Sequence, residues 1–166
     1  MWQAESRWSY RKGGLTAQKE RWDRRAEQFD KGVRRVMNGG VRDRHDYVSI
    51  MLDRIEVKPG WTVLDIGSGP GTLAIPLAKK ARSVTALDIS PEMLKRLAAN
   101  AAKSGLTNIK YLNSSWQDAF AGGLVEKHDV VVASRSLMAG DVREALAGIV
   151  ATAGRAAYLT FPIVHL

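Results

Sequence analysis

The sequence predicts an α/β fold, an open, mostly parallel wound sheet. From Trp61 onward, short apolar runs alternate with longer segments of helical periodicity. Strands that alternate with helices imply right-handed crossovers and a sheet covered on both faces. The 166 residues, 45% hydrophobic and 25% charged, suit one domain with a real core. A disordered chain and a chain of two full domains are therefore not expected.

Two helices are expected before the first strand. Over residues 16–37, apolar side chains recur at three- and four-residue steps, and the segment Asn38-Gly39-Gly40 ends the pattern. The same spacing over residues 42–55 predicts the second helix, which stops before the turn Lys58-Pro59-Gly60. Both helices would precede the sheet in the chain.

Five strands and three further helices are expected after Trp61. The helix at 91–104 has clear start signals, with Ser90 as N-cap and Pro91 in the first helical position. The other helices are expected at 73–81 and 141–153, and the strands at 62–66, 83–87, 108–112, 129–133 and 156–161.

The net charge of +8 is concentrated at the front of the chain. Residues 1–40 hold ten Lys and Arg against five Asp and Glu, a net +5, whereas residues 41–166 hold fifteen against twelve, a net +3. We therefore divide the chain into a basic helical arm or lid (1–40) and a ligand-binding domain (41–166). A solvated helix face is the plainer interpretation of the arm. The alternative is contact with RNA phosphates through five arginines, Arg21, Arg24, Arg25, Arg34 and Arg35.

Composition also excludes several classes of protein. Cys is absent and only three His are present, so no metal site is expected. The first residues lack the apolar core of a signal peptide, and no run approaches the ~20 apolar residues of a membrane span. A cytoplasmic protein with no membrane partner is the resulting expectation.

The candidate binding site is the glycine-rich segment that follows the first strand. Ligands of open α/β sheets bind beyond the carboxyl ends of the strands. Here the segment 63–71 reads Val-Leu-Asp-Ile-Gly-Ser-Gly-Pro-Gly, whose Gly-x-Gly-x-Gly spacing differs from the dinucleotide fingerprint. Asp65 stands two positions before the first glycine, and Asp88 ends the second strand, 21 residues after Gly67. This pattern predicts a nucleoside site whose turn is acidic.

Structural roles compete with these binding roles. Asp65 could cap the turn through the amides of Gly67 and Ser68, and Asp88 could cap the helix that begins near Ser90. Weaker cofactor binding by Asp65→Ala and Asp88→Ala would separate the two interpretations.

In these residues the sequence resembles the class I S-adenosylmethionine-dependent methyltransferases. Segments 63–71, 84–93, 109–118 and 129–137 are similar to that family's successive motifs, in the family's order. The resemblance implies S-adenosylmethionine as cofactor, S-adenosylhomocysteine as its product, and a Rossmann-like sheet of order 3-2-1-4-5-7-6.

The resemblance also implies roles for individual residues. The methionine part would lie among Asp65, Gly67, Ser68, Gly69 and Gly71, the ribose on Asp88, and the adenine against Ile89, Met93, Ser115 and Trp116, with Ser134 and Arg135 between cofactor and substrate. Ser115 departs from the acid or polar group usual in the third motif. The alternative for Trp116 is a structural role in the hydrophobic core. The alternatives for Arg135 are an exposed position in a loop or an ion pair with Asp141.

The reaction implied is in-line methyl transfer, which needs a positioned acceptor and a base only where the acceptor is protonated. His45, Tyr47 and Arg135 are weak catalytic candidates, and the catalytic residues otherwise stay unknown. His128 is expected to be structural, and His165 lies beyond the last strand.

A small-molecule acceptor is favoured, with Trp22 and Phe29 of the arm facing core or substrate. An RNA methyltransferase, a non-catalytic cofactor-binding module and a nicotinamide oxidoreductase are the alternatives. The sequence after the fourth strand lacks the Asn/Asp-Pro-Pro-Tyr/Phe pattern of enzymes that methylate exocyclic amines.

The sequence predicts fewer strands than the fold of the resembling family contains. Five strands are visible, in the order 3-2-1-4-5, and strands six and seven are missing. The fifth strand would then form an open apolar edge. We therefore expect a truncated chain, or a second protomer that covers this edge as a homo-oligomer.

Overall fold

The structure is a computed structural model of the chain and describes residues 14–38, 47–137 and 141–161. None of the helices in these ranges is long and apolar enough to cross a membrane. The helices are α1 (Gly14–Met37), α2 (Tyr47–Arg54), α3 (Ala74–Ala78), α4 (Pro91–Lys103), α5 (Trp116–Ala121) and α6 (Val142–Thr152). The strands are β1 (Thr62–Ile66), β2 (Ser83–Asp88), β3 (Ile109–Asn113), β4 (His128–Ser134) and β5 (Ala153–Thr160).

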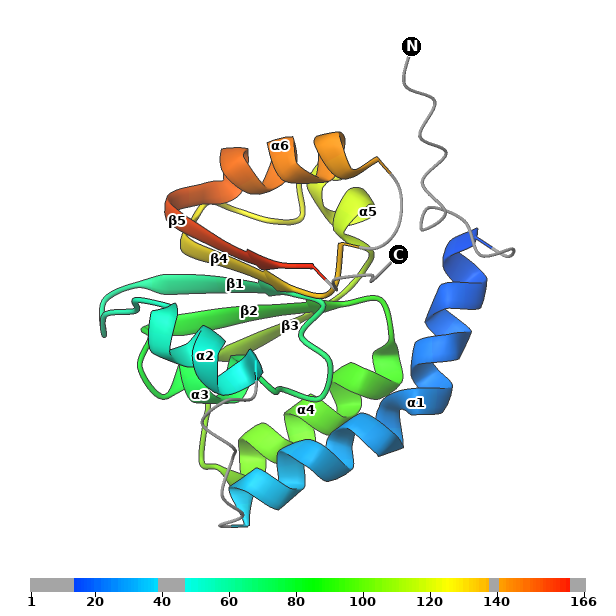
Figure 1. Cartoon of the computed structure of the whole chain (residues 1–166), viewed down its shortest axis with the longest axis vertical. Coiled ribbons are helices and arrows are strands. Elements are labelled where there is room, and N and C mark those ends of the chain that lie inside the picture. Colours follow the sequence, from blue (N-terminus) through cyan, green and yellow to red (C-terminus); the bar gives the residue numbers. More distant parts are fainter. Residues whose placement is uncertain (1–13, 39–46, 138–140, 162–166) are drawn as a thin grey trace.

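The strands form one five-stranded sheet in the order β3-β2-β1-β4-β5, and every pair is parallel (Figure 1). The α/β class, the parallel sheet and this strand order confirm the prediction. The order reverses between β1 and β4, which places the switch point of the sheet beside the glycine-rich segment. All five carboxyl ends lie at one edge of the sheet.

Two hydrophobic clusters cover the two faces of the sheet. Figure 1 shows α2, α3 and α4 on one face and α5 and α6 on the other. In β1, Val63 packs in the first cluster and Leu64 in the second, and Val130 and Val131 of β4 repeat the alternation. Because successive side chains of a strand point to opposite faces, the continuous apolar runs are buried on both sides.

Several boundaries differ from the prediction. Helix α3 ends at Ala78 rather than 81, and the predicted start of the second helix at 42 lies outside the described residues. Helix α5 was not predicted, although Ser115 accepts a hydrogen bond from the amide of Asp118 (3.0 Å) in a Ser-x-x-Asp capping pattern. Strand β5 begins at Ala153 rather than 156, since α6 leads into it without a loop. A register irregularity between His128 and Val130 accommodates the early start.

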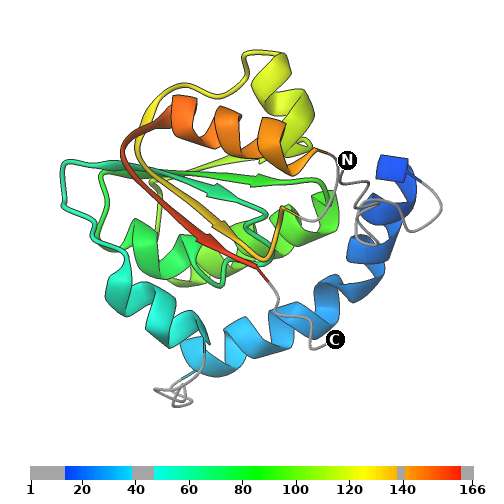
Figure 2. The same ribbon diagram turned by 45° about the horizontal axis from the view of Figure 1, so that its top comes forward.

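Helix α1 packs along α4 and is held there by a buried carboxylate. Asp30 is 4% exposed and accepts hydrogen bonds from Asn100 (2.7 Å) and Arg96 (3.3 Å), both on α4, and pairs with Arg34 (2.9 Å). The Asn100 amide also donates to the carbonyl of Pro70 (3.1 Å). The arm is therefore joined, through one side chain, to the glycine-rich segment. Figure 1 and Figure 2 show the carboxyl-terminal part of α1 beside α4, while the first turns of α1 extend past the start of α4.

Replacing Asp30 tests this attachment. Asp30→Ala leaves Arg96 and Asn100 without their acceptor, so we expect a loss of about 2–3 kcal/mol in the free energy of unfolding. Glu27→Ala is the matched control, because Glu27 pairs only with Lys31 (3.6 Å), and both side chains are well exposed. Urea unfolding of both variants measures the difference. Equal and small losses would contradict an anchoring role for Asp30.

Candidate functional site

A cavity of about 490 Å³ lies at the carboxyl edge of the sheet, between α1 and the loops after β1, β2 and β4. Its volume is typical of small-molecule sites. Ten of the eleven residues predicted to bind a cofactor line it: Asp65, Gly67, Ser68, Gly69, Asp88, Ile89, Met93, Ser115, Trp116 and Ser134. The topology therefore brings together residues that are separated by as many as 69 positions in the chain.

Gly71 is the predicted residue that does not line the cavity. A Cβ atom there would lie 2.4 Å from Cδ1 of Leu97 and 2.7 Å from Cδ1 of Ile75. Its backbone φ of +101° is also one that residues with a side chain rarely adopt. Gly71 therefore serves the close packing of the loop on α3 and α4.

The turn after β1 is held by backbone hydrogen bonds from its own amides. Gly67 and Ser68 both donate to the carbonyl of Leu87, at 2.8 and 3.0 Å. These bonds replace the alternative in which Asp65 would cap the same amides. The Asp65 side chain is thus left for another partner.

Asp65 is buried and incompletely paired. It is 2% exposed, and its Oδ2 has no hydrogen-bond partner. The pKa of Asp65 is raised to about 7, mainly by burial and also by the nearby Asp88 carboxylate, while a hydrogen bond from the Ala74 backbone lowers it. A cationic ligand would supply the charge that this carboxylate lacks.

Asp88 holds the loops and still faces the cavity. Its Oδ2 accepts from the amide of Gly69 and its Oδ1 from the amide of Ser90, both at 2.8 Å. The bond to Ser90 agrees with the predicted capping alternative. Burial raises the pKa of Asp88, while these two backbone bonds lower it. A carboxylate offers about four lone-pair positions, so a ribose hydroxyl can bind beside the two amides.

Two further buried polar atoms at the cavity lack a partner. They are the hydroxyls of Ser68 and Ser136. Ser136 was not among the predicted residues, and it lies where a Cβ on Gly67 would come within 2.3 Å of its own Cβ. Since buried polar groups are almost always hydrogen-bonded, three unpartnered atoms around one cavity fit a polar, partly cationic ligand such as the amino acid end of S-adenosylmethionine.

Ser115 and Trp116 line the cavity and also make hydrogen bonds that stabilise the fold. Ser115 caps α5 and donates to the carboxylate of Asp118 (2.6 Å). The Trp116 indole N–H donates to the carbonyl of Ala145 (3.1 Å), and its ring belongs to the second hydrophobic cluster. The core alternative for Trp116 is therefore correct, with part of the residue on the cavity.

Helix α1 forms the outer wall of the cavity. Trp22 and Phe29 line it, as expected of an arm that faces the site, and their rings meet edge to face at 5.9 Å. Arg21 and Arg25 line it as well, which the sequence interpretation had assigned only to phosphate contacts. The heptad-like spacing of residues 15, 18, 22, 25 and 29 could have placed all of them on one face.

Of the three catalytic candidates, Tyr47 and Arg135 line the cavity, and His45 lies outside the described residues. The guanidinium of Arg135 stacks over the Tyr47 ring at 4.7 Å, whereas Asp141, its suggested partner, caps α6 through the amides of Arg143 and Glu144. Ser134 exchanges a hydrogen bond with Thr160 (3.0 Å).

His128 lies at the opposite end of β4 from the cavity, as a structural histidine should. One ring nitrogen bonds the carbonyl of Glu126 (2.7 Å) and the other the hydroxyl of Thr85 (2.9 Å). Its role is to join β4 to the sheet, in agreement with the prediction. His165 lies outside the described residues.

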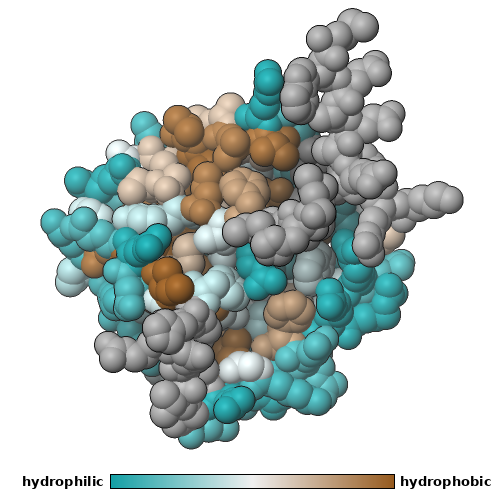
Figure 3. All heavy atoms as spheres, viewed as in Figure 1, coloured by the Kyte–Doolittle hydropathy of each residue, from teal (hydrophilic) through white to brown (hydrophobic). Residues whose placement is uncertain are grey.

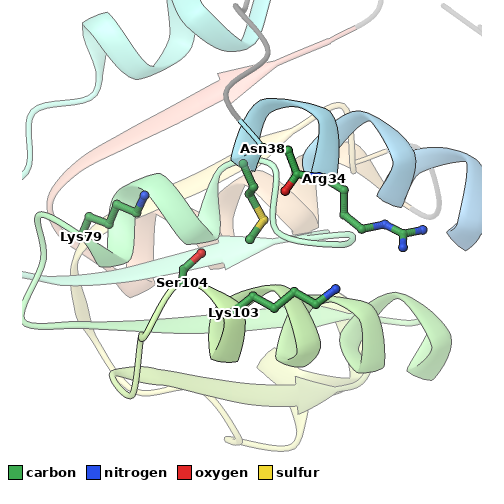
Figure 4. A pocket seen from close by; sticks show the side chains of 6 residues that line it. Arg34, Asn38, Lys79, Lys103 and Ser104 are labelled. Carbon is green, nitrogen blue, oxygen red and sulfur yellow. The ribbon is translucent and has the colours of Figure 1, made fainter.

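A second depression, of about 390 Å³, lies among the carboxyl ends of α1, α3 and α4. Figure 4 shows Lys79 on one side of it, while Arg34 and Lys103 extend away along the other two helices. Arg34 is already paired with Asp30. These cations complement the negative ends of helices, a stabilising arrangement that requires no ligand.

Comparison with known proteins identifies the family of this chain. An uncharacterised protein of Haemophilus influenzae is 34% identical over 140 residues, which cover 84% of this chain and 49% of that protein. The chain thus spans about half the length of this relative. A 23S rRNA (uracil(1939)-C(5))-methyltransferase of Shewanella sediminis is 40% identical over 63 residues, 38% of this chain and 14% of that enzyme.

Among solved structures, the complex of DhpI with SAM and HEP superimposes with a TM-score of 0.65 at 21% identity, covering 94% of this chain and 70% of that one. At this identity the similarity establishes the fold alone. A family model described as a methyltransferase domain matches residues 63–153, more than half of the sequence. The protein therefore belongs to the methyltransferase-domain family, with the Rossmann-like fold of class I S-adenosylmethionine-dependent methyltransferases.

Proposed function

We propose that the cavity at the carboxyl edge holds S-adenosylmethionine and that the chain transfers the cofactor's methyl group to a small-molecule acceptor. The observation that carries the proposal is the buried, incompletely paired carboxylate of Asp65 beside the glycine-rich turn. S-adenosylmethionine supplies an activated methyl group on a sulfonium. The residues of this chain then have to bind the cofactor and the acceptor, orient them for methyl transfer and exclude water from the cavity.

The described residues divide these tasks among three parts of the cavity. Asp65, with the hydroxyls of Ser68 and Ser136 near the turn, provides polar atoms for the amino acid end of the cofactor. Asp88 has free lone pairs for the ribose hydroxyls, and Met93 offers an apolar surface for the adenine. The rings of α1 exclude water from the remaining space.

The packing of the basic helical arm favours a small acceptor over RNA. Trp22 and Phe29 line the cavity, and the helix packs along α4 through the hydrogen bond between Asp30 and Asn100. Arg24 and Arg34, two of the five arginines considered for phosphate contacts, are paired with Glu20 (3.9 Å) and Asp30 (2.9 Å). The similarity to an rRNA methyltransferase extends over 63 residues of this chain and says nothing of the acceptor.

Ligand titration tests the cofactor. We expect S-adenosylmethionine and S-adenosylhomocysteine to raise the melting temperature and NADH to leave it unchanged, because a ligand specific for the folded state stabilises it by RT ln(1 + [L]/Kd). At about 100 times Kd this amounts to about 2.7 kcal/mol. Stabilisation by NADH without stabilisation by S-adenosylhomocysteine would favour the oxidoreductase alternative and contradict the proposal.

Incubation with methyl-labelled S-adenosylmethionine and a cell extract tests the acceptor class. We expect label in the small-molecule fraction, at a level that ribonuclease does not reduce. Label confined to RNA would instead support the RNA methyltransferase alternative, and cofactor binding without label in any fraction would support a non-catalytic module. We also propose that a second protomer covers the exposed edge of β5. Solution scattering tests this by measuring the molecular mass of the particle.

A further inference from the structure

The charges that line the cavity exceed what the cofactor needs. The charged lining residues are Asp65 and Asp88 at the strand ends, and Arg21, Arg25 and Arg135 on the wall formed by α1 and the turn after β4. The cofactor's one carboxylate can occupy one guanidinium in a bidentate pair. Two arginines are then left over on the side where the acceptor has to enter.

These arginines lack acidic partners among the described residues. None of the three takes part in an ion pair there, whereas Arg24, on the outer face of α1, pairs with Glu20 at 3.9 Å. Arg21 and Arg25 are one helical turn apart, a spacing at which like charges destabilise a helix. An anion between them would reverse that effect. Figure 3 shows the hydrophilic surface that α1 presents around this wall.

Aromatic rings hold the three guanidinium groups in place. Arg25 lies 5.8 Å from the ring centroids of both Trp22 and Phe29, and Arg21 lies 5.7 Å from that of Trp22. Arg135 is closer to its ring, 4.7 Å from the centroid of Tyr47. Stacking uses the face of a guanidinium and leaves the N–H groups at its edge free to donate to a ligand.

Arg135 is also held by its backbone. It has a φ of +58° and is the non-glycine residue with positive φ in the described part of the chain. Its amide donates to the carbonyl of Thr160 (3.0 Å), which fixes this conformation at the end of β4. Strained residues of this kind concentrate at binding and catalytic sites.

We propose that the methyl acceptor is a small molecule that carries a carboxylate or a phosphate, and that Arg25 and Arg135 bind this anion while the neighbouring rings contact its apolar body. Arg21 adds positive charge beside them. The inference rests on the proposed function, since it assigns the acceptor class of the same cavity. Arg25 and Arg135 are then the residues that determine specificity.

The test uses three probes that share a ring and differ in charge. 4-Hydroxybenzoate, 4-hydroxybenzamide and tyramine are titrated into the full chain saturated with S-adenosylhomocysteine, and binding is followed by ligand-observed NMR. We expect the anion to bind at least about tenfold more tightly than the neutral amide, as a charge-assisted bidentate pair should, and tyramine to bind most weakly. Inorganic phosphate should compete with the anion. Equal binding of the three probes would overturn the proposal.

Variants assign the effect to the arginines. Arg25→Gln and Arg135→Gln should each weaken 4-hydroxybenzoate about tenfold, leave 4-hydroxybenzamide within about twofold, and leave S-adenosylhomocysteine within about threefold. Arg24→Gln is the matched control, because Arg24 lies beside Arg25 on α1 but does not line the cavity. An equal loss for the control, or a loss of S-adenosylhomocysteine that matches the loss of the anion, would overturn the assignment.

Two further experiments distinguish this inference from RNA binding and from the proposed function. A single-stranded ten-nucleotide RNA that binds more tightly than 4-hydroxybenzoate and depends on the same arginines would overturn it in favour of RNA. Titrating the probes without S-adenosylhomocysteine distinguishes the two proposals. Arginine-dependent binding of 4-hydroxybenzoate in a protein that does not bind S-adenosylhomocysteine would support the anion site and contradict the proposed function.

Discussion

Asp65→Asn should weaken S-adenosylhomocysteine binding about 30-fold at pH 8 and at the same time stabilise the ligand-free protein. The buried carboxylate would pair with the cofactor's ammonium, and hydrogen bonds to charged groups contribute about 1.5–3 kcal/mol. Without a ligand the same charge is desolvated and lies near Asp88. Loss of affinity together with a gain of stability is the behaviour of a binding residue, since a purely structural residue would lose stability.

The pH dependence follows from the raised pKa. Asp65 has a pKa of about 7 in the folded chain against 3.8 in the unfolded one, so the folded state binds more protons between these values. The contribution of Asp65 to the free energy of unfolding therefore falls as pH rises from about 4 to about 7 and is level above that. A shift of three units corresponds to about 4 kcal/mol, which is the largest gain we expect for Asp65→Asn at pH 8. At pH 4 the variant should match the wild type.

Cofactor binding should depend on pH with the opposite sign. A cationic ammonium needs the ionised carboxylate, so affinity for S-adenosylhomocysteine should rise from pH 6 to pH 8 and be nearly constant in Asp65→Asn. Calorimetric titrations at several pH values and urea unfolding at pH 4 and pH 8 measure both effects. Asp53→Asn, which removes an exposed carboxylate away from the cavity, is the control. Equal behaviour of Asp53→Asn and Asp65→Asn would contradict the role of Asp65.

Gly71→Ala should cost about 2–5 kcal/mol of stability, a large part of the 5–15 kcal/mol typical of a domain. The new methyl group would lie 2.4 Å from Leu97 and 2.7 Å from Ile75, both in the packed core. Overpacking of a core costs about 1–3 kcal/mol, and a positive φ adds about 1–2 kcal/mol for a residue with a Cβ.

Gly105→Ala separates these two costs. Gly105 has a φ of +67° but nothing within 4 Å of the position of its Cβ. We therefore expect its substitution to cost only the backbone part, about 1–2 kcal/mol. Thermal and urea unfolding of the two variants give the comparison. If Gly71→Ala is no more destabilising than Gly105→Ala, the close packing of the loop against α3 and α4 does not limit this position.

Periodicity and turn residues were enough to predict most of the fold. The buried strands β1 and β4 are short, largely apolar runs bounded by polar turns, a pattern that identifies them without homologues. Helix α5 was missed because its six residues are too short for a periodicity, and its capping signal at Ser115 was interpreted as a ligand contact. Strand β5 was placed too late because a helix can lead directly into a strand.

The site was predictable where it is made by local sequence and not where it is made by tertiary packing. Asp65, Gly67 and Asp88 belong to strand ends whose spacing along the chain is itself informative. Whether Gly71 faces the cavity or the core depends on Leu97, which lies 26 positions away. Likewise, the stacking of Arg135 on Tyr47 brings together two elements that no local pattern connects.

A crystal structure of the full chain with S-adenosylhomocysteine tests the central claim most directly. The expected result is ligand density in the cavity between α1 and the glycine-rich turn, with the amino group at Asp65 and the ribose hydroxyls at Asp88. Arg25 and Arg135 should remain on the wall of the cavity, without contact to Asp65. Density at another place on the molecule, or an empty cavity at saturating ligand, would contradict the account.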